Sequence, residues 1–369
     1  RTKVFARPDV YGRHLNVLVY MPRELYSADL ADSLAASLRT LSGALDVSAQ
    51  TLVSDGPLAR IYFIASAARL GVNLEVDIEK PLLAAVDGWY TEFDSLVDAV
   101  ADPVMRIDLR KLCAELTSEY IVATAPQSAF LDLSELLHYR SQDRVKVRVE
   151  IDVRGTATIR LLSHGSAPSL SKILPALHNA GVEVDREQAY SIAGGAGSHF
   201  FVTCLRVDAD SAAKLAKAQV ANASQELFES LLNNEAEDGR MNGLVIEAGL
   251  RTKEVQLIRA YASYWRQAGS RFSLRYMADC LRKQPNVVRM MVESFMTRFN
   301  PALNAEQRAA GTTALTAIKK NLSDINHADT EDILRSIADL MLATLRTSYF
   351  QSAQINDTII FKFDSSQLV

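Results

Sequence analysis

The first hundred residues alternate short apolar runs with longer segments in which apolar residues recur at helical spacing. Residues 14–21 form a nearly continuous apolar run, which predicts a buried strand. An amphipathic helix should follow and end near Gly43, because leucines recur at three- and four-residue steps: Leu30, Leu34, Leu38 and Leu41. Two strands are predicted at 45–53 and 59–65, and a second helix at 78–97. The predicted order is strand, helix, strand, strand, helix.

The same order recurs further along the chain. A strand is predicted at 156–162, a helix between Ser169 and Gly181, strands at 182–192 and 199–207, and a helix at about 210–233. Repetition of this unit predicts an α+β fold with two ferredoxin-like βαββαβ domains. Each should contain an antiparallel sheet with helices on one face. Residues 200–207 are apolar on both faces of the strand, so a second sheet or another subunit should cover the face opposite the helices.

The remaining segments complete the predicted domain organisation. Helices are expected at 109–120 and 131–139, and an exposed strand at 144–153. From Asn234 to about Phe350 the pattern is helical, and a last strand at 358–363 has no obvious partner. We therefore predict five segments: a first ACT-like domain (1–100), a helical connector (101–143), a second ACT-like domain (144–234), a helical domain (235–352) and a terminal strand (353–369).

Composition excludes several classes of function. The chain has 369 residues, 40 basic against 44 acidic side chains and a net charge of -4, which gives no general attraction to nucleic acid. Three separated cysteines are typical of a reducing cytoplasm, and no apolar run is long enough to span a membrane. The chain starts at Arg1 without an initiating methionine, and we expect it to be part of a longer protein.

One local segment, IRAYASYWRQAGSRFSLRYM at 258–277, is rich in arginine and aromatic residues and could suggest a nucleic-acid site. On a helical wheel, however, its tyrosines and tryptophan lie on a different arc from its first two arginines. A single-strand binder needs aromatic and cationic groups in one groove. We therefore predict a packed helical hairpin with no nucleic-acid partner, whose arginines form a rim for contacts with other domains or subunits: Arg259, Arg266, Arg271 and Arg275.

No catalytic, cofactor-binding or metal-binding residues are predicted. The six histidines do not fall at metal-ligand spacing with cysteines or carboxylates. The glycine-rich GGAG at 194–197 precedes a strand and lacks the lysine of a phosphate-binding loop, so a hairpin turn is predicted there.

Several long motifs in order carry a resemblance to a known family. They are RTKVFARPDVYGRHLNVLVYMPRELYS (1–27), PLARIYFIAS (57–66), LSKILPALHNAGVEV (170–184), EAEDGRMNGLVIEAGLRTKEVQLIRAYASYWRQAGSRFSLRYMADCL (235–281) and TLRTSYFQ (344–351). Together they resemble the region that precedes the catalytic domain in the large bacterial NAD-specific glutamate dehydrogenases. The resemblance covers essentially the whole chain.

This resemblance implies a modular enzyme in which ACT-like domains precede a Rossmann-containing catalytic domain that oxidises L-glutamate with NAD. The glycine-rich and lysine-bearing catalytic segments of the family do not occur in this chain, which is expected to be inactive alone and to bind no cofactor. Its expected partners are the catalytic domain and further copies of the same protein.

The resemblance also implies a place for a regulatory ligand. ACT domains often bind amino acids where the first strand meets the first helix, and here the corresponding loop contains Gly165, Ser166 and Ser169. Backbone N–H groups at a helix N-terminus suit a carboxylate. Ser169 stands where the family usually has glycine, so a fold used purely for assembly remains the alternative to an amino-acid sensor.

Overall fold

Alternating burial along the second strand defines the first sheet. The computed structural model describes residues 2–11, 13–23, 26, 28–53, 58–66, 74–139, 144–152, 154–194, 198–351 and 358–367. The first sheet contains β1 (Lys3–Pro8), β2 (His14–Pro22), β3 (Asp46–Val53) and β4 (Leu58–Ser66), in the antiparallel order β1-β2-β4-β3. Every second residue of β2 and β4 points inward and is at most 1% exposed: Leu15, Val17, Val19, Met21, Ala59, Ile61, Phe63 and Ala65.

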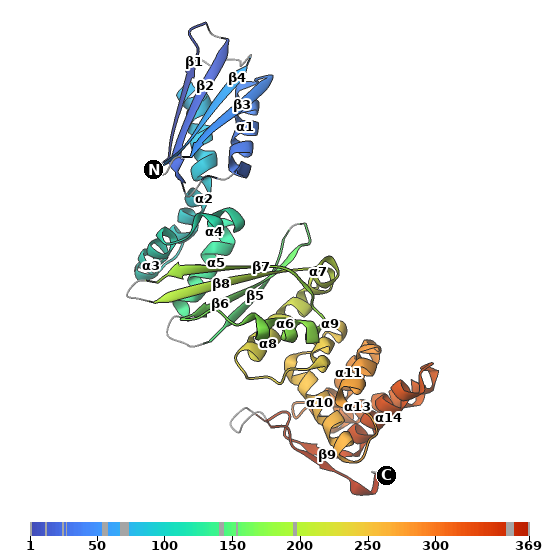
Figure 1. Cartoon of the computed structure of the whole chain (residues 1–369). Helices are drawn as coiled ribbons and strands as arrows, with labels where there is room; N and C mark the ends of the chain where they lie inside the picture. The colour runs from blue at the N-terminus through green and yellow to red at the C-terminus, as the bar shows by residue number, and fades with distance from the viewer. Residues whose placement is uncertain are drawn as a thin grey trace. The chain divides into compact units, whose positions relative to one another are not determined.

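Two helices cover one face of this sheet (Figure 1). They are α1 (Ala28–Ser42) and α2 (Lys80–Asp98), and a π-helical turn at Glu75–Glu79 precedes α2. Leu34 and Leu38 of α1 and Leu82 of α2 join the strand residues in one core. The leucine spacing in the sequence therefore predicted the buried face of α1 correctly.

A helical connector follows α2. It contains α3 (Pro103–Ala114), α4 (Ser118–Ala123) and α5 (Pro126–His138). The indole Nε1 of Trp89 in α2 donates to the Thr124 carbonyl oxygen at 2.7 Å, and the Trp89 ring stacks on Phe93. In the buried centre the Tyr120 hydroxyl donates to Asp132 at 2.5 Å, and the Tyr120 ring meets that of Tyr190 edge to face. The connector thus covers part of β7, whose second half belongs to the same compact unit.

The second sheet repeats the topology of the first. Its strands are β5 (Lys146–Ile151), β6 (Ala157–His164), β7 (Val184–Ala193) and β8 (His199–Val207), in the order β5-β6-β8-β7. Helices α6 (Leu170–Ala180), α7 (Ala209–Leu215) and α8 (Ala218–Leu232) follow in sequence, and α6 and α8 share a core with the strands (Figure 1). The single helix expected at 210–233 is therefore two helices. Residues 195–197 of the expected GGAG turn lie outside the described residues.

The order of elements in both ACT-like domains differs from the expected βαββαβ at both ends. A hairpin partner, β1 or β5, comes before the first predicted strand, and the unit ends on a helix without a further strand. Each sheet still has four strands, because the leading strand, β1 or β5, forms the edge beside β2 or β6. The exposed strand expected at 144–153 corresponds to β5, which is the edge strand of the second sheet.

The chain is helical from Arg240 to Ala343. It contains η3 (Arg240–Asn242), α9 (Gly243–Ala248), α10 (Thr252–Gln267), α11 (Leu274–Arg282), α12 (Pro285–Phe299), α13 (Ala305–Asn321), η4 (Leu322–Asp324) and α14 (Ala328–Ala343). In the second ACT-like domain, Pro175 lies within α6, and the helix continues past it to Ala180.

Two expectations about the C-terminal segment were wrong. Helix α14 ends at Ala343 and not near Phe350, and β9 (Thr344–Thr347) follows it directly. Strand β10 (Phe361–Phe363), expected to lack a partner, pairs antiparallel with β9 before a final turn, η5 (Ser365–Gln367). The end of α14 is held by Arg298 of α12. Its guanidinium donates hydrogen bonds to the carbonyl oxygens of Met341, Leu342 and Thr344.

Contact density divides the chain into two compact units. The first contains residues 1–143, 164–166 and 190–202, and the second contains 144–163, 167–189 and 203–369. Gly165 and Ser166 belong to the first unit, whereas Ser169 and the helical region from Arg240 onward belong to the second.

Candidate functional site

The loop expected to bind an effector lies between β6 and α6. Gly165 has a left-handed backbone with φ of +79°, and its N–H donates to the His199 carbonyl oxygen at 2.9 Å. Ser169 is the N-cap residue of α6, but its hydroxyl lies 2.8 Å from that of Ser171 and does not cap the helix. Gly165, Ser166 and Ser169 are all exposed. Ligand binding at these residues stays a prediction.

The aromatic side of α10 forms the core of the helical region. Tyr261 is fully buried, its ring lies 4.5 Å from that of Phe361, and its hydroxyl is 2.8 Å from that of Thr344. Burial raises the pKa of Tyr261 above its ordinary value. Trp265 contacts Phe272 across the following turn. These aromatic rings are packed against protein groups, as the helical wheel predicted for a hairpin.

The four arginines of the expected rim fall into different environments. Arg266 and Arg275 are exposed. Arg271 is exposed too, but it pairs with Asp329 at 3.1 Å and lies over the ring of Phe272. Arg259 departs from the expectation, because it is only 8% exposed.

Arg259 is an internal anchor for the turn that precedes α9. Its Nη1 pairs with Glu237 at 3.1 Å and donates to the Asp238 carbonyl oxygen, and its Nη2 donates to the Asn242 side chain at 2.7 Å. A Cβ on Gly239 would lie 3.1 Å from Nη1. The helical wheel placed Arg259 on the polar side of α10, away from the apolar core. The turn before α9 packs over this part of the polar side, and Arg259 is therefore buried.

Arg282, a polar group with several partners in the helical region, was not identified from the sequence. Arg282, at the end of α11, forms a two-pronged ion pair with Glu247 of α9: Nε lies 2.9 and 3.0 Å from the two carboxylate oxygens, and Nη2 lies 2.5 Å from Oε1. The Glu247 carboxylate raises the pKa of Arg282 above its ordinary value. Nη1 also reaches the carbonyl oxygens of Asn179 and Arg240 at 3.4 and 3.5 Å.

We call this group the seam: Arg282, Glu247, Asn179, Gly181 and Gly243. It joins the end of α6, in the second ACT-like domain, to α9 and α11 of the helical region. Both glycines leave space for the guanidinium, since a Cβ would lie 2.8 Å from Arg282 Nη2 at Gly181 and 2.4 Å from Nε at Gly243. Gly181 was predicted only as a helix cap, and it does have a left-handed φ of +86°.

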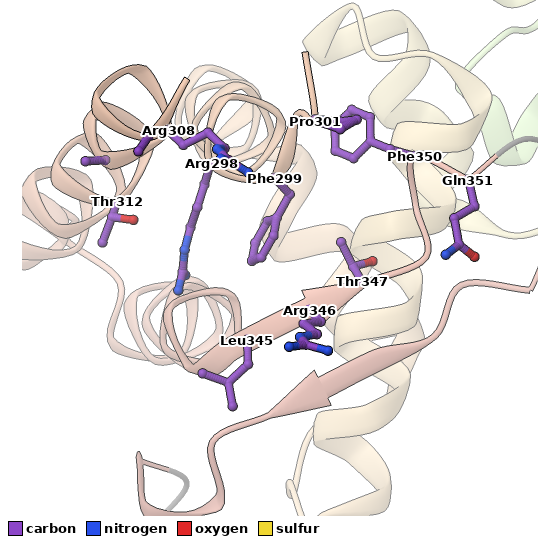
Figure 2. Close-up of a pocket in the computed structure, with 12 residues that line it drawn as sticks. Arg298, Phe299, Pro301, Arg308, Thr312, Leu345, Arg346, Thr347, Phe350 and Gln351 are labelled. Carbon is purple, nitrogen blue, oxygen red and sulfur yellow. The ribbon is translucent and has the colours of Figure 1, made fainter. Parts of the chain in front are cut away.

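The described residues of the second unit line cavities at two places of interest. One, of about 350 Å³, lies beside the seam and is bordered by Asn179, Asp238, Arg259 and Arg275. The other, of about 650 Å³, lies where α12, α13 and β9 meet (Figure 2). Its lining includes Arg298, Arg308 and Arg346, one from each element or its adjoining end.

Two further observations concern the described residues only. They contain no group of three or more histidine, cysteine, aspartate or glutamate side chains placed to hold a metal ion. Within the same residues, no helix combines the length and the apolar character that crossing a membrane requires.

Two ferredoxin-like sheets, each with its helices and followed by a helical region, define a protein with tandem ACT-like domains. Three family models match it in chain order: the glutamate dehydrogenase ACT2 domain at residues 3–90, the ACT3 domain at 134–220 and helical motif 3 at 236–301. The chain belongs to the family of the NAD-specific glutamate dehydrogenases. The family and the fold class expected from the sequence are therefore confirmed.

Individual relatives agree with the family models. The chain is 29% identical to the NAD-specific glutamate dehydrogenase of Mycobacterium tuberculosis over 389 residues, which cover 98% of this chain and 24% of that protein. The proteins of the same name from Pseudomonas aeruginosa and Halomonas elongata are 29% and 26% identical, over 99% and 100% of this chain. The chain thus spans about a quarter of the length of these curated relatives.

Proposed function

We propose that this chain is the regulatory and assembly portion of an NAD-dependent glutamate dehydrogenase. The parent reaction converts L-glutamate, NAD and water to 2-oxoglutarate, ammonia and NADH. Glutamate oxidation and NAD binding belong to another part of the parent protein, and this chain alone is inactive. We place the parent in the cytoplasm, in keeping with the three free cysteines.

The observation that carries this proposal is the seam. A guanidinium that bonds Glu247 of α9 and the carbonyl oxygens of Asn179 and Arg240 fixes the second ACT-like domain to the helical motif. Contacts of this kind hold two domains in a fixed relative position and contribute no reactive group. It suits a part of the protein that holds other parts in place.

Activity measurements test this division of labour. The purified chain is incubated with L-glutamate and NAD, and NADH formation is followed by absorbance at saturating concentrations of both. A longer chain of the same protein, extended to the length of the relatives, is the positive control. We expect turnover by the extended chain alone, and glutamate-dependent NADH formation by this chain would overturn the proposal.

Assembly is tested by light scattering. Arg266 and Arg275 are exposed, and together with Arg271 they form the rim through which we expect contacts with other domains or subunits. The double variant Arg266→Glu with Arg275→Glu should reduce the mass of any oligomer. Arg289→Glu, an exposed arginine on α12, is the matched control. A chain that is monomeric at all concentrations, or equal losses in both variants, would contradict assembly through this rim.

An amino-acid sensor is the second candidate function. The exposed start of α6 favours it, because Ser169, the N-cap residue, gives no side-chain hydrogen bond to the helix N-terminus at the expected ligand position. Calorimetric titration with the twenty amino acids and 2-oxoglutarate separates the two candidates. Saturable binding that Gly165→Ala weakens supports a sensor, and silence with every compound supports a role in assembly only.

A further inference from the structure

The larger cavity gathers positive charge from three separate segments. Arg298 lies near the end of α12, Arg308 in the first turns of α13 and Arg346 in β9, and Figure 2 shows all three around one hollow. The cavity has a volume of about 650 Å³, and its described lining contains no aspartate or glutamate. Three cations thus line one space without an acidic residue among them.

The guanidinium of Arg298 is hydrogen-bonded to the protein and remains positively charged. Its Nη1 donates to the carbonyl oxygens of Met341 and Leu342 at 2.7 and 3.0 Å, and its Nη2 donates to that of Thr344 at 3.0 Å. These acceptors are neutral carbonyls at the end of α14, whose dipole provides about half an opposite charge. Burial lowers the pKa of Arg298. The guanidinium still adds to the positive potential of the cavity wall.

Arg308 and Arg346 are available for a ligand. Both are exposed, and within the described part of the chain neither forms an ion pair. Guanidinium groups bind carboxylates and phosphates through paired N–H donors, and such charge-assisted bonds are about twice as strong as neutral ones. Thr312 and Thr347 add hydroxyl groups to the same lining.

The cavity also has an apolar side. Phe299, Phe350 and Leu345 line it, and Leu345 is 51% exposed, which is high for a large apolar side chain. Small-molecule sites typically have volumes of about 300 to 1,000 Å³ and combine apolar walls with a few convergent polar groups. A bare inorganic ion would leave the apolar wall in contact with water.

We propose that this cavity binds an organic anion with at least two negative charges next to an apolar body. Arg308 and Arg346 bind the charged groups of the ligand, and Arg298 adds to the positive potential of the cavity. The apolar body of the ligand contacts Phe299, Phe350 and Leu345. A dicarboxylate and an organic phosphate share this chemistry. The site is separate from the loop at 165–169 and does not depend on the proposed function of the chain.

Calorimetric titration with defined probes tests this site in the whole chain. The probes are isophthalate, an aromatic dicarboxylate, and phenyl phosphate, an aromatic phosphate monoester. Inorganic phosphate and sulfate serve as probes of charge alone. We expect saturable binding of isophthalate or phenyl phosphate that is at least tenfold tighter than that of either inorganic ion, and the better aromatic probe identifies the acidic group.

Variants locate the binding. Arg308→Gln with Arg346→Gln should weaken the better probe at least tenfold, whereas Arg206→Gln with Arg289→Gln removes the same charge from exposed positions outside the cavity and should change it less than twofold. Leu345→Ala should weaken the aromatic probe but not inorganic phosphate. Circular dichroism checks that each variant is folded. Silence with both aromatic probes, binding as tight by inorganic ions, or equal losses in the two double variants would each overturn the proposal.

Discussion

Replacement of Gly243 by alanine tests whether the seam holds its guanidinium rigidly. Gly243 is the first residue of α9, is buried and has a helical φ of -58°, so its backbone would accept alanine without strain. The new Cβ, however, would lie 2.4 Å from both Nε and Cζ of Arg282. Arg282 can make room only by moving away from Glu247, which holds Nε and Nη2 at 2.5 to 3.0 Å.

The expected free energies have opposite signs in two backgrounds. Alanine in place of glycine within a helix is favourable by about 0.5 to 1 kcal/mol. Disrupting a buried ion pair costs about 3 to 5 kcal/mol, and we discount this to about 2 to 4 kcal/mol because the Arg282 and Glu247 side chains are 16% and 25% exposed. Gly243→Ala should therefore lower the free energy of unfolding by about 1 to 3 kcal/mol. In an Arg282→Ala background the same change should instead be neutral or stabilising by up to about 1 kcal/mol.

The assay is a double-mutant cycle measured by urea denaturation with far-ultraviolet circular dichroism. A chain with two compact units can unfold in more than one step, so hydrogen exchange at α9 and at the end of α6 should accompany the denaturation curves. A Gly243→Ala protein as stable as the wild type would mean that the guanidinium relocates at little cost. A penalty that persists in the Arg282→Ala background would mean that the clash has another source. Either result would refute a rigid seam.

Three other properties can be predicted from the described contacts. Gly311→Ala should lower the urea midpoint, with a loss of about 1 to 3 kcal/mol, because a Cβ there would lie 2.6 Å from backbone atoms of α12 that cannot move independently. Burial raises the pKa of the Cys113 thiol to about 12, so peptide mapping after iodoacetamide treatment at pH 8 should show Cys113 alkylated more slowly than the half-buried Cys204. The hydrogen bonds from Ser211 lower the pKa of Asp208 at the start of α7, so its stabilising contribution is complete above its unfolded pKa of 3.8 and is lost as the pH falls through the folded value. The melting temperatures of wild type and Asp208→Ala should therefore converge as the pH falls below 3.8, and a constant difference would contradict this assignment.

Periodicity predicted the strands of both sheets except β1, because the buried face of each element is a local pattern. The alternation in β2 and the leucine spacing in α1 each describe one buried face, and burial is what the structure shows for Val17, Val19, Leu34 and Leu38. The position of the fourth strand was not predictable in this way. Strand β1 pairs with β2 through a hairpin, and this pairing joins two segments whose separate patterns do not say which strands become neighbours.

Features that depend on distant partners escaped prediction for the same reason. The strand β9 follows α14 without a glycine or proline, and its partner β10 lies beyond Gln351. The seam depends on Asn179, Glu247 and Arg282, which are separated by 68 and 35 residues along the chain. Nothing in the sequence around Gly243 distinguishes a glycine that makes room for a guanidinium from one that merely starts a helix.

The arginines of the helical region explain why an arginine-rich sequence was a poor guide to its surface. Arg259, Arg282 and Arg298 each direct at least one N–H to a main-chain carbonyl oxygen at a turn or a helix end. Helix ends leave carbonyl groups without intrahelical partners, and a long planar guanidinium can satisfy several of them at once. A region of short helices joined by tight turns therefore needs arginine inside. Its exposed arginines, such as Arg266 and Arg275, are the ones that can contact other molecules. Buried and exposed arginines can be told apart only when the burial of each side chain is known.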